Sequence, residues 1–159
     1  MDLSLVDPDN RRPVDNDLRR RLLAELAMDP SPEDVLAGMD EGLPKLWLVR
    51  QALRLRASEP DAFGANATYR ALWPRGARAD HVFAFARDER VVAIAPIRPL
   101  GLGHRFVDWD HGDTSVVLPP GPVLDVCTGA RVDGGEQRLE DLLRRVPVAL
   151  LVADRERTR

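Results

Sequence analysis

Hydrophobic residues in the first third of the chain recur at helical spacing. Leu18, Leu22 and Leu26 stand four residues apart, and the pair Asp15-Asn16 is placed to cap the helix that they define. The stretch SPED, which begins at Ser31, predicts a second helix start, because serine caps well and proline fits the first turn. The opening third is therefore expected to be helical.

A third helix is predicted for residues 43–58, just before Pro60. Its leucines, valine and tryptophan cover more than one face, in the stretch LPKLWLVRQALRL. An ordinary surface helix has a single apolar stripe, so this pattern predicts a helix that packs on two sides, as against a larger body. An unfilled side of this helix would favour self-association of the chain.

From Tyr69 onward the hydrophobic period changes to two. HVFAFAR and VVAIAPI predict two strands joined by the short loop DER, and SVVL, PVLDVC and PVALLVA predict three more. Glycine- and proline-rich breaks separate them, namely PLGLG, LPPGP and TGARVDGGE. The pattern favours an antiparallel sheet or sandwich, and hence two regions, a helical one at 1–64 and a β domain at 65–159.

Charge and composition exclude several classes of protein. The 159 residues carry a net charge of -3, which argues against a nucleic-acid module. No apolar run approaches the roughly 20 residues that cross a bilayer, and the first 15 residues lack the features of a signal peptide. We therefore expect a cytoplasmic location, with neither a membrane nor a nucleic acid as partner.

Metal and cofactor chemistry is not indicated. Cys127 is the single cysteine and lies in a strand-like stretch, where a small buried side chain is expected. His81, His104 and His111 are scattered without the spacing of a metal cage or of a catalytic dyad. The sequence therefore predicts no metal site, no cofactor and no catalytic thiol.

Lys45 is the only lysine among 23 basic residues. All the others are arginine, so a compact, flexible ammonium at this position could have a specific role. Chance placement is the alternative, since a single lysine has to fall somewhere.

Three stretches resemble the C-terminal part of the maltooligosyltrehalose synthases, enzymes of the α-amylase clan. They are DLSLVDPDNRRPVD, DEGLPKLWLVRQALRLR and ANATYRALW. HVFAFARDERVVAIAP, LPPGPVLDVCTG and VPVALLVAD resemble the closing β domain of the same family. The resemblance implies an α+β chain, in which 1–64 holds a substrate loop and helices from the end of a TIM (β/α)8 barrel. Residues 65–159 would be a C-terminal antiparallel β-sandwich.

The resemblance also implies substrate contacts in the opening loop. In the clan, an Asp-Pro-x-Asn-Arg pattern after the last barrel strand binds the sugar beside the scissile bond, and Asp7 and Arg11 match it. A carboxylate and a guanidinium suit sugar hydroxyls well. Arg12 and Lys45 are further possible contacts. An ordinary turn, with Arg12 paired to a nearby aspartate, is the competing interpretation.

No catalytic residue is expected within this chain. The family isomerises the reducing-end α-1,4 link of a maltooligosaccharide to an α,α-1,1 link, with carboxylates on middle barrel strands that lie outside these stretches. The chain is therefore expected to be an inactive C-terminal fragment whose partners are the missing barrel and the maltooligosaccharide substrate. A stand-alone glucan-binding module and a fragment of an α-glucan hydrolase are the alternatives.

Tryptophans and a cluster of aspartates are weaker candidates for sugar contact. Trp73 and Trp109 fall in predicted loops and could stack on sugar rings, whereas Trp47 belongs to the leucine-rich helix and is expected in the core. The acidic stretch FVDWDHGDT, with Asp108, Asp110 and Asp113, is best interpreted as a loop between strands.

Overall fold

The computed structural model describes residues 15–154, and its contacts divide the chain into two compact units, Met1–Gln51 and Ala52–Arg159. This division falls inside the third helix, earlier than the boundary between 1–64 and 65–159 suggested by the sequence. The boundary between residues 64 and 65 stays a prediction. None of the helices in the described range is long and apolar enough to cross a membrane.

Helices form where the sequence predicts them. They are α1 (Asn16–Ala27), α2 (Pro32–Ala37) and α3 (Leu43–Ser58), with a single 3-10 turn at Met39–Glu41 before α3. The Asp15 side chain accepts a hydrogen bond from the backbone N–H of Leu18 at 2.8 Å, and the Ser31 hydroxyl accepts one from the Asp34 N–H at 3.2 Å. Both predicted caps are confirmed, and each satisfies a backbone donor that the helix leaves unpaired.

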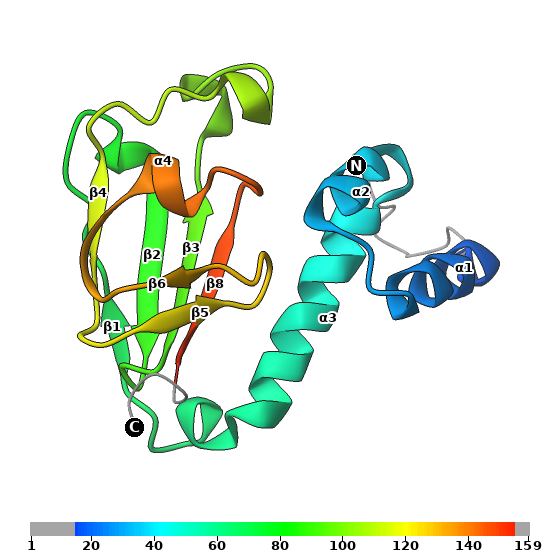
Figure 1. Ribbon diagram of the computed structural model, residues 1–159, viewed down its shortest axis with the longest axis horizontal. Coiled ribbons are helices and arrows are strands. Elements are labelled where there is room, and N and C mark those ends of the chain that lie inside the picture. The colour runs from blue at the N-terminus through cyan, green and yellow to red at the C-terminus, as the bar shows by residue number, and fades with distance from the viewer. Residues whose placement is uncertain (1–14, 155–159) are drawn as a thin grey trace, which may run out of the picture. The chain divides into compact units, whose positions relative to one another are not determined.

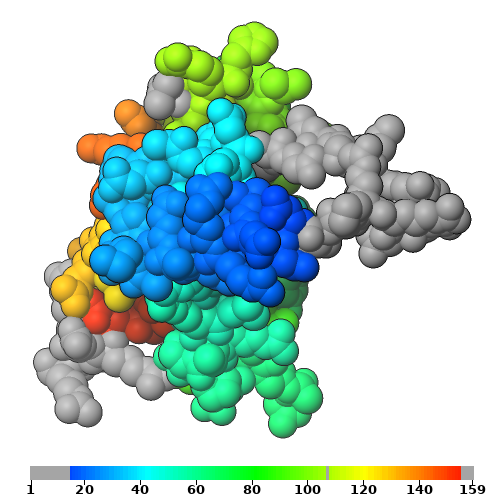
Figure 2. Space-filling view, turned by 90° about the vertical axis from the view of Figure 1, so that its right-hand side faces the viewer, coloured from blue at the N-terminus to red at the C-terminus, as the bar shows by residue number. Residues whose placement is uncertain are grey.

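The first unit buries one stripe of each helix. Its buried apolar side chains come from all three helices, and they are Leu22, Leu26, Val35, Leu43 and Trp47. The Arg50 guanidinium donates to the Leu26 carbonyl at the end of α1, and Arg21 pairs with Glu41 at 2.7 Å. Figure 2 shows this unit in blue and cyan, from a side on which α1 faces the viewer.

The two-sided burial predicted for the third helix is only partly observed. Leu43 and Trp47 are buried in the first unit and Leu55 in the second, but Val49 and Leu53 are exposed. The described residues therefore leave one apolar stripe of α3 uncovered.

The second unit is built on antiparallel strands (Figure 1). One sheet has six strands in the order β1-β2-β3-β8-β5-β6, and β4 pairs with β7 in a second sheet. The strands are β1 (Tyr69–Ala71), β2 (Val82–Arg87), β3 (Val91–Pro96), β4 (Ser115–Leu118), β5 (Val123–Asp125), β6 (Arg131–Val132), β7 (Gly135–Arg138) and β8 (Ala149–Ala153). The mixture of helices and antiparallel sheet confirms the α+β expectation. The barrel origin of the helices and the sandwich stay predictions.

The two sheets share one core. Val82, Ala84 and Ala86 alternate along β2 toward it, and Val116 and Leu118 of β4 enter it from the second sheet. The four-residue helix α4 (Leu139–Leu142) contributes leucines to the same cluster. A bridge between Arg75 and Ser115 joins the extension of β1 to β4, so the second sheet continues from the edge of the first.

The other face of the six-stranded sheet has a separate apolar layer. Leu55 at the end of α3 and Ala62 in the 3-10 turn Pro60–Phe63 pack with Val91 of β3. Leu150 and Val152 of β8 join this layer from the same sheet face, because they lie opposite Ala93 and Val91 in the register. Here the chain covers the sheet on both sides.

Charged side chains fasten the rim of this second layer. The Arg87 Nε donates to the Ala62 carbonyl at 3.2 Å, and its guanidinium lies 5.9 Å from the centre of the Phe63 ring. Arg90 forms an ion pair with Glu59, whose side chain is largely buried. These contacts fix the 3-10 turn to the β2–β3 hairpin.

The DER loop closes that hairpin as predicted. Arg87 pairs with Val91 in the register and leaves three residues in the loop, with Asp88 and Glu89 both at a φ of 52°. Positive φ at two successive central residues is the turn geometry that matches the right-handed twist of paired strands. Glu89 also forms an ion pair with Arg70 of β1.

The glycine-rich stretch TGARVDGGE is not a simple break, as the sequence suggested, because it holds β6 and the start of β7. A Cβ on Gly134 would lie 2.3 Å from the Pro119 carbonyl oxygen, and Gly135 has a φ of +89°. A side chain at position 134 would collide with the backbone, and residues other than glycine rarely adopt the φ of position 135. Glycine at both positions therefore lets the chain pass from one sheet into the other. The glycines mark a corner between two short strands.

Asp125 organises the loop that follows β5. Its buried carboxylate accepts hydrogen bonds from the Cys127 N–H at 3.0 Å, the Thr128 hydroxyl at 2.6 Å and the Leu150 N–H at 3.4 Å. Burial raises the pKa of Asp125, and burial also raises the pKa of the Cys127 thiol to about 12. The prediction that Cys127 is a small buried side chain is confirmed.

Two neighbouring valines of β4 test whether the second sheet shares the main core. Val116 is 1% exposed and Val117 is 44% exposed. Val116→Ala should lower the free energy of unfolding by about 2 kcal/mol, since two buried methyl groups are lost and a cavity remains. Val117→Ala should change it by less than about 0.5 kcal/mol. Urea unfolding of both variants checks this, and equal effects would contradict the shared core.

Two substitutions at Asp125 test its structural role. Asp125→Ala leaves buried backbone donors unpaired and should cost about 2–4 kcal/mol, whereas Asp125→Asn keeps an acceptor oxygen and should cost much less. Because the folded state raises the pKa of Asp125, the wild type should gain stability relative to Asp125→Asn as the pH falls from 7 toward 4. Unfolding curves at several pH values measure the difference, and a difference independent of pH would refute it.

Candidate functional site

Three of the predicted substrate contacts cannot be located in the structure. Asp7, Arg11 and Arg12 lie outside the described residues. Their roles therefore remain predictions based on the resemblance.

Lys45 lies on α3 and is exposed. At helical spacing it shares a face with Val49 and Leu53, the two exposed apolar residues of this helix. Within residues 15–154 it makes no hydrogen bond or ion pair. Its ammonium is thus accessible at one end of an uncovered stripe, and its function stays a prediction.

The buried carboxylates of the described range stabilise the fold. Asp125 holds the loop after β5, and Asp154, directly after β8, forms an ion pair across β5 with Arg131 of β6, with a distance of 2.7 Å to the arginine Nε. Residues 15–154 contain no group of three or more histidine, cysteine, aspartate or glutamate side chains that could hold a metal ion. Both carboxylates are therefore interpreted as structural.

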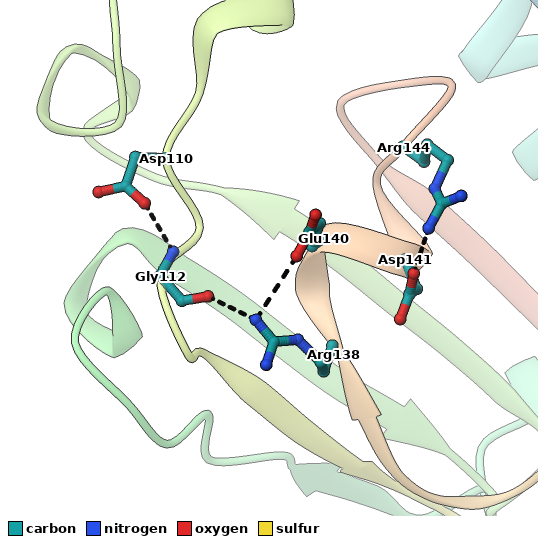
Figure 3. A network of polar contacts seen from close by, with 6 residues as sticks. All are labelled: Asp110, Gly112, Arg138, Glu140, Asp141 and Arg144. Atoms are coloured by element: carbon teal, nitrogen blue, oxygen red, sulfur yellow. Dashed lines mark hydrogen bonds and ion pairs between the residues drawn. The ribbon is translucent and has the colours of Figure 1, made fainter.

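The acidic stretch between β3 and β4 forms a loop, as expected, and polar contacts fasten its end (Figure 3). Arg78 pairs with Asp110 at 2.6 Å, and Asp110 accepts from the Gly112 N–H at 2.9 Å. These contacts hold the pKa of Asp110 below its usual value. Arg138 of β7 donates to the Gly112 carbonyl at 2.9 Å and approaches Glu140 at 3.5 Å. The aspartate thus anchors the loop.

The three tryptophans differ in their surroundings. Trp47 is buried, which confirms the expectation from its helix. Trp109 is half-buried, with the edge-on rings of Phe106 at 5.3 Å and His111 at 6.3 Å, and burial lowers the pKa of His111. Trp73 is 82% exposed, beside the end of β1. Only Trp73 therefore presents most of its ring to solvent.

The uncovered part of the outer sheet face gathers aromatic rings. Tyr69 of β1 stacks on Phe85 of β2 at 5.2 Å between ring centres, and Phe83 lies 5.5 Å from Phe85. Tyr69 is 54% exposed and Phe83 is 47% exposed. We call Tyr69, Phe83 and Phe85 the aromatic face. Such a surface can pack against apolar groups or stack on flat rings.

This face was not predicted from the sequence, although the sequence contained a signal for it. In VFAFA and VVAIA the apolar residues occupy both alternating sets, whereas a strand with one wet face shows polar residues at every second position. Two-sided apolar strands predict a sheet that is covered on both sides. The order of residues along a strand does not show which part of the outer sheet face is covered by other segments of this chain.

Comparisons with known proteins agree on one group. No family model matches the chain. The chain is 38% identical over 153 residues to a protein of Mycobacterium tuberculosis assigned as a maltooligosyl trehalose synthase, and the same match occurs in two strains. The alignment covers 96% of this chain and 17% of that relative. The chain thus spans about a sixth of the length of the relative it matches.

Solved structures give the same result. The maltooligosyltrehalose synthase of Arthrobacter ramosus, in wild-type and mutant form, superposes with a TM-score of 0.75 and 37% sequence identity, over 95% of this chain and 18% of that enzyme. A further maltooligosyl trehalose synthase structure superposes with a TM-score of 0.59 at 22% identity, which supports the fold. By sequence and by fold, the chain matches the C-terminal part of the maltooligosyltrehalose synthases.

Proposed function

We propose that this chain is the C-terminal portion of a maltooligosyltrehalose synthase. The parent enzyme would be an isomerase that converts the reducing-end α-1,4 link of a maltooligosaccharide to an α,α-1,1 link. The observation that carries the proposal is 38% identity over 96% of the chain, together with the superposition on the Arthrobacter ramosus enzyme. The similarity extends over both the helical unit and the β unit. It therefore favours a function shared with these enzymes over the presence of one related domain in an unrelated protein.

In this proposal the chain supports the reaction without performing its bond-breaking steps. The α-1,4 bond is cleaved as a carboxylate forms a glycosyl-enzyme, and the anomeric hydroxyl of the released glucose then attacks that intermediate. The nucleophile and the acid belong to the barrel that precedes this portion. Asp7 and Arg11 would hold a glucose ring beside the scissile bond through charge-assisted hydrogen bonds. A cytoplasmic location is part of the same proposal.

A stand-alone glucan-binding module is the second candidate. The exposed rings of the aromatic face favour it, because sugar rings stack on aromatic side chains. The exposed stripe of α3 also leaves room for self-association of the chain. Binding of maltoheptaose by the chain alone, measured by calorimetry, would support this module, and the products of the parent enzyme would separate an isomerase from a hydrolase.

The chain by itself should form no trehalosyl product. Incubation with maltopentaose should leave the sugar unchanged, because the two reacting carboxylates are absent in this proposal. A polypeptide that joins the chain to the preceding part of a maltooligosyltrehalose synthase should produce a terminal trehalose unit, detected by chromatography. Product formation by the isolated chain would refute the assignment. Release of glucose or maltose as the main product of the joined polypeptide would favour the hydrolase.

Asp7→Ala and Arg11→Ala should each slow glucan turnover in that joined polypeptide. Loss of a charge-assisted hydrogen bond costs about 2 kcal/mol, which corresponds to about a 30-fold fall in kcat/KM. Val117→Ala, far along the chain and exposed, is the matched control and should retain activity. Unchanged kinetics in both loop variants would remove Asp7 and Arg11 from the substrate site.

A further inference from the structure

The end of the loop between β3 and β4 is joined to two other segments of the second unit. Arg78, just before β2, pairs with Asp110 at 2.6 Å. Arg138 of β7 donates to the Gly112 carbonyl at 2.9 Å (Figure 3). We call residues 110–114, held by these contacts, the loop junction.

The backbone of the loop junction is held on the C-terminal side of His111 as well. The Ala77 N–H donates to the Asp113 carboxylate at 2.8 Å, and the Thr114 N–H donates to the His111 carbonyl at 3.1 Å. A change of backbone conformation at His111 would therefore disturb contacts between segments that lie far apart in the sequence.

The side chain of His111 differs from the neighbours that hold the loop junction. Its Nδ1 is shielded from solvent and forms no hydrogen bond with any residue in the range 15–154. The ring lies edge-on to Trp109, with 6.3 Å between the ring centres. A neutral imidazole can keep such a nitrogen as an unpaired acceptor, whereas an imidazolium carries a proton on both nitrogens. Protonation would thus create a buried donor without an acceptor.

Charged groups surround His111 from its own loop and from the neighbouring segments. Asp110 precedes it, and Glu140 acts on it from the start of α4. Both carboxylates have arginine partners, since Arg78 pairs with Asp110 at 2.6 Å and Arg138 approaches Glu140 at 3.5 Å. Burial lowers the pKa of His111, and the carboxylates of Glu140 and Asp110 offset only part of this effect. The closed loop junction therefore favours the neutral ring.

We infer that His111 is an acid-sensitive release for the loop between β3 and β4. Protonation adds a positive charge and a second N–H donor to a ring whose buried nitrogen faces no acceptor. Opening of the loop junction exposes the ring to water, which solvates both the charge and the donor. The inference concerns the second unit alone and does not rest on the proposed function.

The direction of the pH effect follows from the two states of the loop. A histidine in an opened loop takes up its proton at the ordinary pKa of about 6.5, whereas the closed loop junction lowers the pKa of His111. The open state therefore binds more protons as the pH falls below about 6.5, and opening becomes easier. Above that pH both states hold the neutral ring, so the loop junction has its full stability.

Hydrogen exchange of the chain at about pH 7 and about pH 5.5 tests this release. After correction for the intrinsic effect of pH on exchange, protection of the amides in 110–114 should fall about fivefold at the lower pH. His111→Gln cannot titrate in this range and should show no such fall. His104→Gln replaces an exposed histidine of the same loop and is the matched control, which should behave as the wild type. The amides of β8 should keep their protection, because the opening is local.

Three results of this experiment would overturn the inference. They are unchanged protection of the loop junction in the wild type, an equal fall in His111→Gln, and loss of the fall in His104→Gln. An equal loss of protection in β8 would also overturn it, because acid would then unfold the whole unit and not release the loop.

An NMR titration of the wild type keeps the inference testable if His111→Gln does not fold. The ring signals of His111 and the amide signals of Gly112 and Thr114 should then move together as the pH falls, since one protonation changes them all. Ring signals that titrate while both amide signals stay unchanged would refute the release.

Discussion

Strands β2, β3 and β8 are apolar on both faces, and the rest of the second unit is arranged to cover them. One face lies against the second sheet and α4, where Val116 and Leu139 are buried. The other face receives the end of α3 and its following turn through Leu55 and Ala62. Apolar surface left in water costs about 25 cal/mol per Å², so cover on each side stabilises a sheet of this composition.

Polar contacts hold the segments that pack on the sheet in position, and they bury little additional apolar surface. Arg87 and Arg90 hold the 3-10 turn against the hairpin, and Asp125 ties the loop after β5 to β8. Each of these side chains satisfies a carbonyl, a carboxylate or a backbone donor that would otherwise be lost to burial. Gly134 and Gly135 let the chain pass from one sheet to the other, because a side chain at 134 would collide with the Pro119 carbonyl and Gly135 has a positive φ.

The same constraint links the fold to the proposed role. Both α3 and the outer sheet face leave apolar residues exposed, namely Val49 and Leu53 on the helix and the aromatic face on the sheet. Two uncovered apolar surfaces are expected of a portion shaped by contact with a larger neighbour. In that view the chain contributes a substrate loop and a packing surface, and the bond-breaking carboxylates belong to the neighbour.

Local sequence was sufficient for the helices, their caps and the β2–β3 hairpin, because each depends on residues a few positions apart, such as Ser31 with Asp34. The family resemblance was also present in the sequence. Strands β6 and β7 could not be predicted, since two to four residues flanked by glycine become strands only when a partner strand supplies the pairing, as Val116 of β4 does for Gln137. The tertiary structure alone decided which half of the two-sided apolar sheet is covered, because coverage depends on where the end of α3 packs and not on the composition of the strands.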